Sequence, residues 1–100
     1  MGISFTKKLR PAVMAGEITI SVRFWHSARV KVGSRSPLGY GHVVVTGIRE
    51  ITLDDITGKM ATDSGFKDID DMLKVARHGS SERIFLVEFE YEEGDALFAP

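Results

Sequence analysis

Residues 16–25, with the sequence GEITISVRFW, constrain the fold of this chain more than any other segment, because apolar and polar side chains alternate strictly along them. Such alternation is typical of a β-strand, in which successive side chains point to opposite faces. The apolar face is expected to pack in the core and comprises Ile18, Ile20, Val22 and Phe24. The other face carries hydrogen-bonding groups, a cation and an indole ring, and is the leading candidate for a ligand site: Glu17, Thr19, Ser21, Arg23 and Trp25.

The segments around this strand have weaker local patterns. Residues 3–5 are expected to form a short strand, and residues 11–15 a short helix that ends at Gly16. Residues 28–32 alternate enough for a brief strand. The glycine-rich residues that follow, up to position 41, are expected to form a mobile loop.

Two later segments are predicted to be central strands. Residues 42–48, HVVVTGI, are β-branched and nearly continuous in hydrophobicity, with Gly47 as a candidate bulge. Residues 83–91 place aromatic and aliphatic side chains on one face at every second position. We expect that face to be buried.

Two helices are predicted between these strands. Thr52 and Asp55 have the spacing of a capping box and open a helix expected over residues 53–62. Gly65 breaks it. The second helix is expected over residues 68–78, with apolar residues at helical spacing and basic residues in its last turn.

The order of these elements predicts an α+β fold, built on a small curved sheet or β-barrel of about five to six strands with two to three flanking helices. A chain of 100 residues has room for a single domain. Residues 3–91 are expected to form its core. Residues 92–100 have no usable period and are expected to be a flexible tail.

The composition excludes several classes of protein. The chain has no cysteine, and therefore no disulfide or thiolate metal site. No apolar run approaches the length of a membrane span or of a signal peptide, so a cytoplasmic protein without a membrane partner is expected. The three histidines lack the spacing of metal ligands, and no cofactor motif occurs. The oligomeric state is not determined by the sequence.

The charge is distributed unevenly along the chain. Residues 1–47 contain seven lysine and arginine side chains against Glu17 alone, a net charge of +6, and since the whole chain carries −1, the remainder carries −7. If the basic residues converge in space, they would attract a polyanion. The alternative is that the two halves neutralise each other across the fold.

The chain resembles the ASCH (activating signal cointegrator homology) family along residues 3–91. The resemblance rests on the order of its motifs: a basic N-terminal segment, a short helix ending in Ala-Gly, the strand Gly-x-x-Thr-x-Ser-x-Arg, a glycine-rich loop, a valine-rich strand, Ile-Thr-Leu-Asp-Asp-Ile, Asp-Ser-Gly-Phe and a terminal aromatic strand. It implies a PUA-like β-barrel and an RNA-binding module.

Some ASCH proteins are enzymes, and the resemblance implies candidate catalytic positions. One branch hydrolyses N4-acetylcytidine with a lysine, a threonine and a glutamate; these positions fall here on Ile18, Ser21 and about Ser64, with Asp63 adjacent. The lysine is therefore absent. Others resemble ribonucleases that use tyrosine, lysine and serine, for which the residues of those types here are Tyr40, Lys31 or Lys59, and Ser21.

Single-stranded RNA requires cations for phosphate, aromatic faces for bases, and hydrogen bonds for base edges or the 2′-OH. The first half of the chain contains all three kinds of side chain. We therefore predict an RNA-binding cleft, for single-stranded RNA or a modified nucleotide, formed by Lys7, Lys8, Arg10, Thr19, Arg23, Trp25, Arg29, Lys31, Arg35 and Tyr40.

Two other functions remain open at this point. A small metal-independent hydrolase would use Ser21 activated by a lysine such as Lys59, or a water activated by Glu17 or Asp63. A protein-interaction module would use the acidic second half to meet a basic partner.

Overall fold

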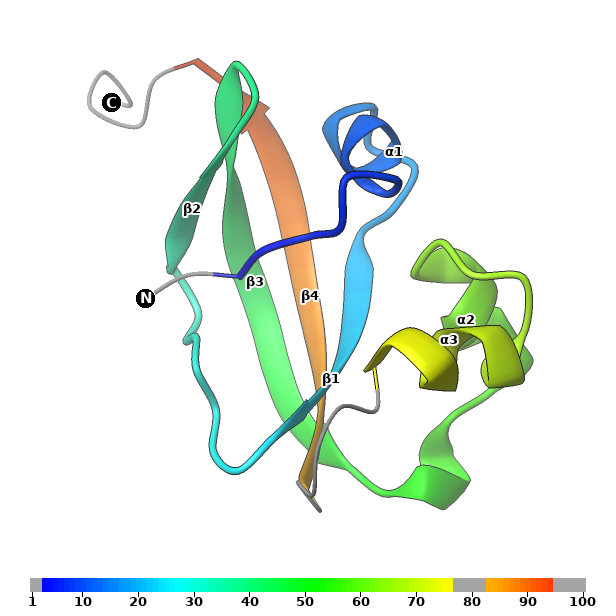
Figure 1. The fold of residues 1–100 in the computed structure, drawn as a ribbon. Coiled ribbons are helices and arrows are strands. Elements are labelled where there is room, and N and C mark those ends of the chain that lie inside the picture. Colours follow the sequence, from blue (N-terminus) through cyan, green and yellow to red (C-terminus); the bar gives the residue numbers. More distant parts are fainter. Residues whose placement is uncertain (1–2, 77–82, 95–100) are drawn as a thin grey trace.

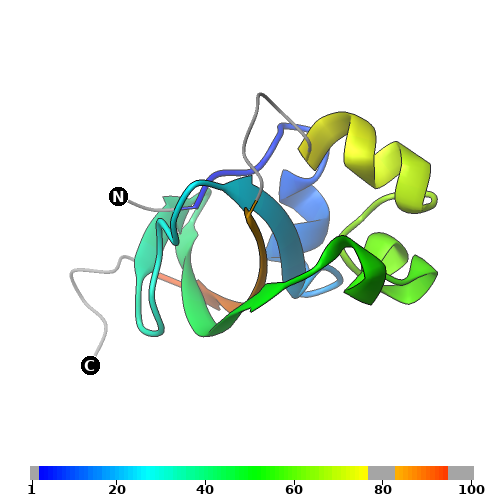
Figure 2. The same cartoon turned by 90° about the horizontal axis from the view of Figure 1, so that it is seen from below.

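The computed structural model describes residues 3–76 and 83–94. In this part of the chain the sheet has four strands in the order β1-β4-β3-β2, and all neighbours are antiparallel. The sheet curls into a half-barrel, with the helices on one side of it (Figures 1 and 2). The elements are α1 (Arg10–Met14), β1 (Ile20–Trp25), β2 (Arg35–Leu38), β3 (Gly41–Ile51), a 3-10 helix η1 (Leu53–Asp55), α2 (Gly58–Asp63), α3 (Ile69–Ala76) and β4 (Arg83–Glu93).

The N-terminal segment, residues 3–6, crosses the opening of the half-barrel between the edge strands β1 and β2 (Figure 1). Its burial alternates, with Ile3 and Phe5 inside and Ser4 exposed. The backbone N–H of Ile3 donates to Ser36 Oγ of β2 at 2.9 Å. The prediction of a strand at residues 3–5 is therefore wrong in detail, because side chains rather than a backbone ladder hold this segment.

The sheet is buried on its inner face and, where the helices cover it, on its outer face as well. The inner face and the N-terminal segment form one core, in which the Phe5 and Phe89 ring centroids lie 5.1 Å apart. The outer face of β1 and β4 packs against α2 and α3 in a second core, which contains Val22, Leu86 and the fully buried Met72. The helix pair and the inner-face core together position both sides of β1.

This double burial corrects the expected division of the 16–25 segment. Its regular strand begins only at Ile20, and Val22 packs in the core as expected. The face expected to be open to a ligand looks into the curl of the sheet, where Ser21 and Trp25 are each 9% exposed. The reason is the curvature, which turns this face inward.

The predictions of two central strands are confirmed. β3 and β4 are the inner strands of the sheet, and both extend beyond the predicted ranges. The register shifts between Val45 and Gly47, as the candidate bulge predicted. β4 buries Phe85 and Phe89 and continues to Glu93, so residues 92 and 93, which were expected in a flexible tail, belong to the strand. Residues 95–100 of that tail lie outside the described residues.

The prediction of a strand at residues 28–32 is wrong. A turn occurs instead, with Ser34 N–H donating to the Lys31 carbonyl, and Gly33 at a φ of +92°. The strand of this region is β2, four residues long, which pairs with β3. Together with residues 3–5, this reduces the expected five to six strands to four in the described chain.

The predictions for the helices hold in part. α1 and α3 lie close to the predicted ranges, although the predicted end of the second at Arg77 and His78 falls outside the described residues. The predicted helix at residues 53–62 is wrong, because it is divided into η1 and α2. Ile56 interrupts it with extended backbone and a buried side chain, and Thr57 then caps α2 by accepting from Met60 N–H.

None of the helices in the described part of the chain has the length and hydrophobicity needed to cross a bilayer.

Gly41, at the start of β3, lies where the backbones of β3 and β4 approach each other closely. A Cβ atom at this position would overlap the Glu92 backbone of β4. We expect Gly41→Ala to lower the free energy of unfolding by about 1–3 kcal/mol, because backbone cannot move aside as a side chain can. Urea denaturation followed by circular dichroism measures this.

Gly58→Ala is the matched control, since nothing lies within 4 Å of an added Cβ at the first residue of α2. It should leave stability unchanged or raise it by up to about 1 kcal/mol. Equal stability of the two variants would contradict the close approach.

Candidate functional site

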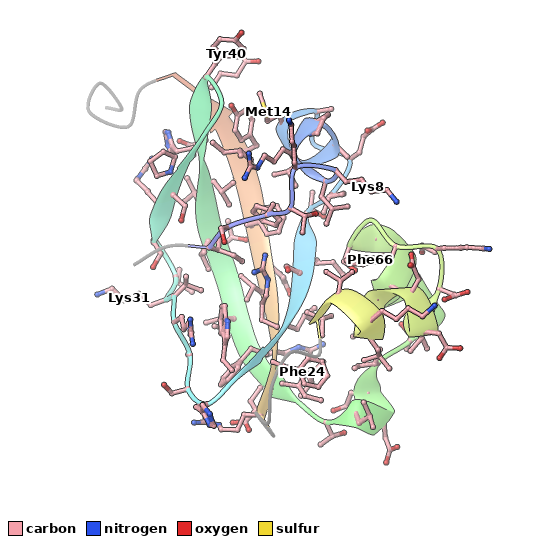
Figure 3. All side chains as sticks on the ribbon, in the orientation of Figure 1. Lys8, Met14, Phe24, Lys31, Tyr40 and Phe66 are labelled. Atoms are coloured by element: carbon pink, nitrogen blue, oxygen red, sulfur yellow. The ribbon has the colours of Figure 1, made fainter. Side chains whose placement is uncertain are left out.

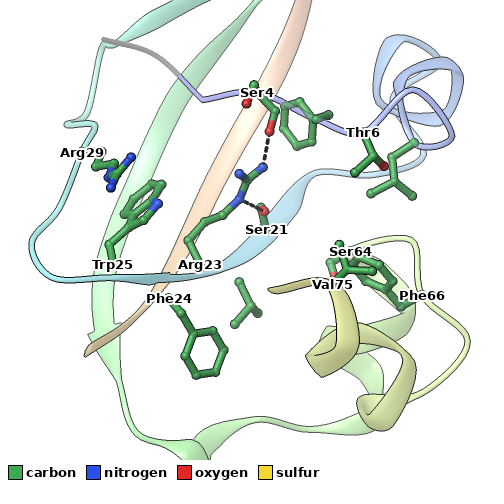
Figure 4. Close-up of a pocket in the computed structure, with 13 residues that line it drawn as sticks. Ser4, Thr6, Ser21, Arg23, Phe24, Trp25, Arg29, Ser64, Phe66 and Val75 are labelled. Atoms are coloured by element: carbon green, nitrogen blue, oxygen red, sulfur yellow. Dashed lines mark hydrogen bonds between the residues drawn. The ribbon is translucent and has the colours of Figure 1, made fainter. Parts of the chain in front are cut away.

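A pocket of about 310 Å³ opens beside β1, between the N-terminal part of the chain and the α2–α3 pair (Figure 4). We call it the Arg23 pocket. Its volume is at the lower end of the ~300–1,000 Å³ typical of ligand sites, which suits one small group. Its described lining residues are Ser4, Phe5, Thr6, Leu9, Ser21, Val22, Arg23, Phe24, Trp25, Arg29, Ser64, Phe66 and Val75.

The half-buried Arg23 side chain is held in place by its neighbours (Figure 4). Its Nε donates to Ser21 Oγ at 2.7 Å, and its Nη2 donates to the Ser4 carbonyl oxygen at 2.6 Å. The guanidinium carbon lies 5.2 Å from the centroid of the Phe5 ring, within the range of a cation–π contact. The guanidinium therefore has a fixed orientation in the pocket wall.

The Arg23 guanidinium is a poorly solvated cation. Burial lowers the pKa of Arg23 to about 10, because the charged form loses water. The group still carries its charge at pH 7. No carboxylate of residues 3–76 or 83–94 forms an ion pair with it, and no acidic side chain is among the described lining residues. An anion in this pocket would supply the missing counter-charge.

Four hydroxyl-bearing residues line the same pocket: Ser4, Thr6, Ser21 and Ser64. Ser21 accepts from Arg23, which leaves its own proton available as a donor. Ser64 Oγ donates to the Ala61 carbonyl at 3.0 Å, as a buried hydroxyl at the end of α2. A hydroxyl donates and accepts, so this lining suits the edge of a base or a ribose 2′-OH.

Aromatic rings complete the lining. Trp25 packs on Phe85 with ring centroids 5.9 Å apart and is only 9% exposed, so it forms a wall more than a free stacking surface. Phe24 and Phe66 are partly exposed. They are the rings that retain surface for a flat ligand.

The basic residues expected at the site converge only in part. Arg29 lines the Arg23 pocket together with Arg23. Lys7 and Lys8 are exposed in a turn that is closed by a hydrogen bond from Leu9 N–H to the Thr6 carbonyl oxygen. Thr6 and Leu9, the two ends of this turn, line the pocket. Arg10 lines a different pocket.

The remaining predicted RNA-binding residues lie elsewhere. Figure 3 shows Lys31 on the opposite side of the barrel from Lys8, and Tyr40 at the far end from Phe24. Tyr40 is 88% exposed in the turn between β2 and β3. Thr19 is exposed just before β1 and contacts β4 through its carbonyl oxygen. None of these side chains lines the Arg23 pocket in the described chain.

Arg35 is also outside the pocket. It contacts the buried His42 ring and lies 3.4 Å from the Glu92 carboxylate. The charge of Arg35 is therefore balanced by a carboxylate of the acidic second half. This is what the alternative of mutual neutralisation predicted for all the basic residues of the first half.

Of the four predicted catalytic residues, only Ser21 lines the pocket. Glu17 is exposed in the turn after α1. Lys59 and Asp63 pair with each other at 2.6 Å on the exposed side of α2, at the helical spacing of i and i+4. The described lining residues include no lysine, histidine or carboxylate that could serve as a general base. Among residues 3–76 and 83–94, no three histidine, aspartate or glutamate side chains cluster as potential metal ligands.

Several lining residues were not singled out by the sequence. Ser4 and Thr6 alternate along the chain with the buried Ile3 and Phe5. This alternation is the sequence pattern that could have indicated their exposure. Phe24 was assigned to the core face. Phe66 follows Gly65 at the break between two helices, and no local pattern marks it as a lining residue.

Comparison with known proteins gives no relative: no family model, no curated protein and no solved structure matches the chain.

Ser21→Ala tests whether Ser21 supports Arg23. The change removes the acceptor of Arg23 Nε and leaves a charged donor unsatisfied in a partly buried position. We expect it to lower the free energy of unfolding by about 1–3 kcal/mol.

The control is the same substitution in an Arg23→Met background, where no donor remains to be left unpaired. There Ser21→Ala should cost less than half as much, which is the coupling that a double-mutant cycle detects in thermal or urea unfolding. Additive losses would show that the two side chains act independently.

Proposed function

We propose that this protein binds single-stranded RNA by accommodating one unpaired nucleotide in the Arg23 pocket. The observation that carries the proposal is a desolvated, oriented guanidinium without a carboxylate partner in the described chain, surrounded by hydroxyls and partly exposed aromatic rings. Phosphate, sugar and base each have a matching group in this lining.

The guanidinium has capacity left for a phosphate. An arginine has five N–H groups, and Arg23 uses two of them on Ser21 and Ser4. No other acceptor of these groups occurs among residues 3–76 and 83–94. A phosphate would accept from the remaining N–H groups in the forked geometry that arginine favours. Arg29 supplies a second positive charge in the same pocket.

The base would lie against Phe24 or Phe66, which retain exposed ring surface. Stacking on an aromatic side chain contributes roughly 1–3 kcal/mol per base and accepts any base. The serine and threonine hydroxyls would bind a base edge or the 2′-OH, the group that distinguishes RNA from DNA. The same lining would accept a modified base that leaves the sugar and phosphate unchanged.

The curled antiparallel sheet with flanking helices is compatible with a small barrel-like domain, and we propose that it is an ASCH-like member of the PUA-like folds. The pocket then lies where β1, the N-terminal segment and the helix pair meet.

Binding is favoured over hydrolysis by the composition of the pocket. A serine nucleophile needs a base within hydrogen-bond distance. In the described chain Ser21 Oγ is hydrogen-bonded to Arg23, which cannot act as a base at neutral pH. Some acidic residues of the protein-interaction alternative already have structural contacts: at the start of α3, Asp68 accepts from Asp71 N–H and Asp71 accepts from Lys67 N–H.

Arg23→Gln should weaken binding of a fluorescein-labelled random RNA octamer by about 10- to 100-fold, because a hydrogen bond to a charged group contributes roughly 1.5–3 kcal/mol. The slope of log Kobs against log salt concentration should fall in magnitude by about 0.7, the value for one phosphate contact on a single strand. Fluorescence anisotropy at several salt concentrations measures both.

Arg49→Gln is the matched control, since Arg49 is an exposed arginine of β3 that does not line the pocket. It should bind within about twofold of the wild-type protein. Arg23→Lys, which keeps the charge without the forked donors, covers the case in which Arg23→Gln does not fold. Wild-type binding without a salt slope, or equal binding by all variants, would exclude the proposal.

A further inference from the structure

A second pocket, of about 340 Å³, adjoins the first on the other side of the N-terminal segment. Ser4 and Phe5 line both pockets, so this one stretch of chain is the ridge between them. The far wall of the second pocket is β2, through Pro37 and Leu38. Its described lining residues include no carboxylate.

Arg10 supplies the charge of the second pocket. Its Nε donates to the Phe5 carbonyl oxygen at 3.1 Å. On the other side of the ridge, Arg23 donates to the carbonyl of the preceding residue, Ser4. Successive peptide groups of extended backbone face opposite sides, and therefore the two arginines hold the same segment from opposite directions.

The arrangement leaves donors for a ligand in both pockets. Arg10 is exposed, and no ion pair involving it occurs in the described chain, so its terminal N–H groups remain available. The ridge is one chain wide, about 5 Å of backbone. Because the ridge is this narrow, consecutive nucleotides of one strand can lie on its two sides.

We infer that the Arg10 pocket is a phosphate subsite for the nucleotide that adjoins the one bound at Arg23. The ligand class is therefore an RNA oligonucleotide that crosses residues 4–5, in place of a free nucleotide. The inference rests on the proposed function, and it adds a direction to it: from the helix side of the ridge, across the N-terminal segment, to β2.

The experiment compares the four ribonucleoside 5′-monophosphates with random RNA tetranucleotides on wild-type protein and on Arg10→Gln, Arg23→Gln and Arg49→Gln, by chemical-shift titration. Arg10→Gln should leave mononucleotide affinity unchanged. It should weaken the tetranucleotide roughly fivefold, the upper range for an exposed charge pair, and reduce the salt slope by about 0.7. Arg23→Gln should weaken both ligands, and Arg49→Gln neither.

A second variant distinguishes the loss of the Arg10 charge from a change in the conformation of the ridge. Pro37→Glu places an anion in the Arg10 pocket from the exposed edge strand β2, without removing the Arg10 hydrogen bond to Phe5. It should weaken the tetranucleotide alone.

The outcomes separate the two proposals. If Arg10→Gln and Pro37→Glu bind both ligands as the wild type does while Arg23→Gln loses both, the subsite is overturned and the proposed function stands. Equal weakening of mononucleotide and tetranucleotide by Arg10→Gln would also overturn the subsite. If Arg23→Gln changes neither ligand, the proposed function fails.

Discussion

The closure of the half-barrel by the N-terminal segment is the interaction on which the rest of the structure depends. A four-stranded sheet that curls leaves two unpaired edges, here β1 and β2, and its inner face needs a lid. Ile3 and Phe5 fill the inner core, while the hydrogen bonds of Ile3 to Ser36 and of Ser4 to Arg23 attach the segment to both edges. Because the attachment is made by side chains, it leaves gaps on each side, and these gaps are the two pockets.

This closure gives Arg23 a structural role that is compatible with its proposed binding role. Its structural contacts use two of its five N–H groups and fix the plane of the guanidinium. Binding a ligand would therefore cost little further side-chain entropy. The burial that makes Arg23 a support of the fold also leaves its charge poorly solvated, and this is why we propose it as an anion site. Arg10 repeats the arrangement at the surface, where water weakens its charge.

Local patterns predicted much of the fold. Features that depend on neighbouring residues in the sequence were predicted correctly: the alternation of β4, the β-branched run of β3 and the bulge before Gly47. The helix expected over residues 53–62 failed for a reason outside its own sequence. Ile56 is drawn into the core beneath the helix pair, and burial of its side chain outweighs the continuation of a helix that its neighbours alone would allow.

The sequence by itself determined that Ser21, Arg23 and Trp25 share one face of a strand, because the strand period depends on nothing beyond the chain. Only the tertiary structure decided which charges join them. Arg29 and Arg10 come to the ridge, whereas Arg35 meets Glu92 and Lys31 lies across the barrel. The curvature of the sheet and the path of its first residues set these distances, and a net charge counted along the chain contains no information about either.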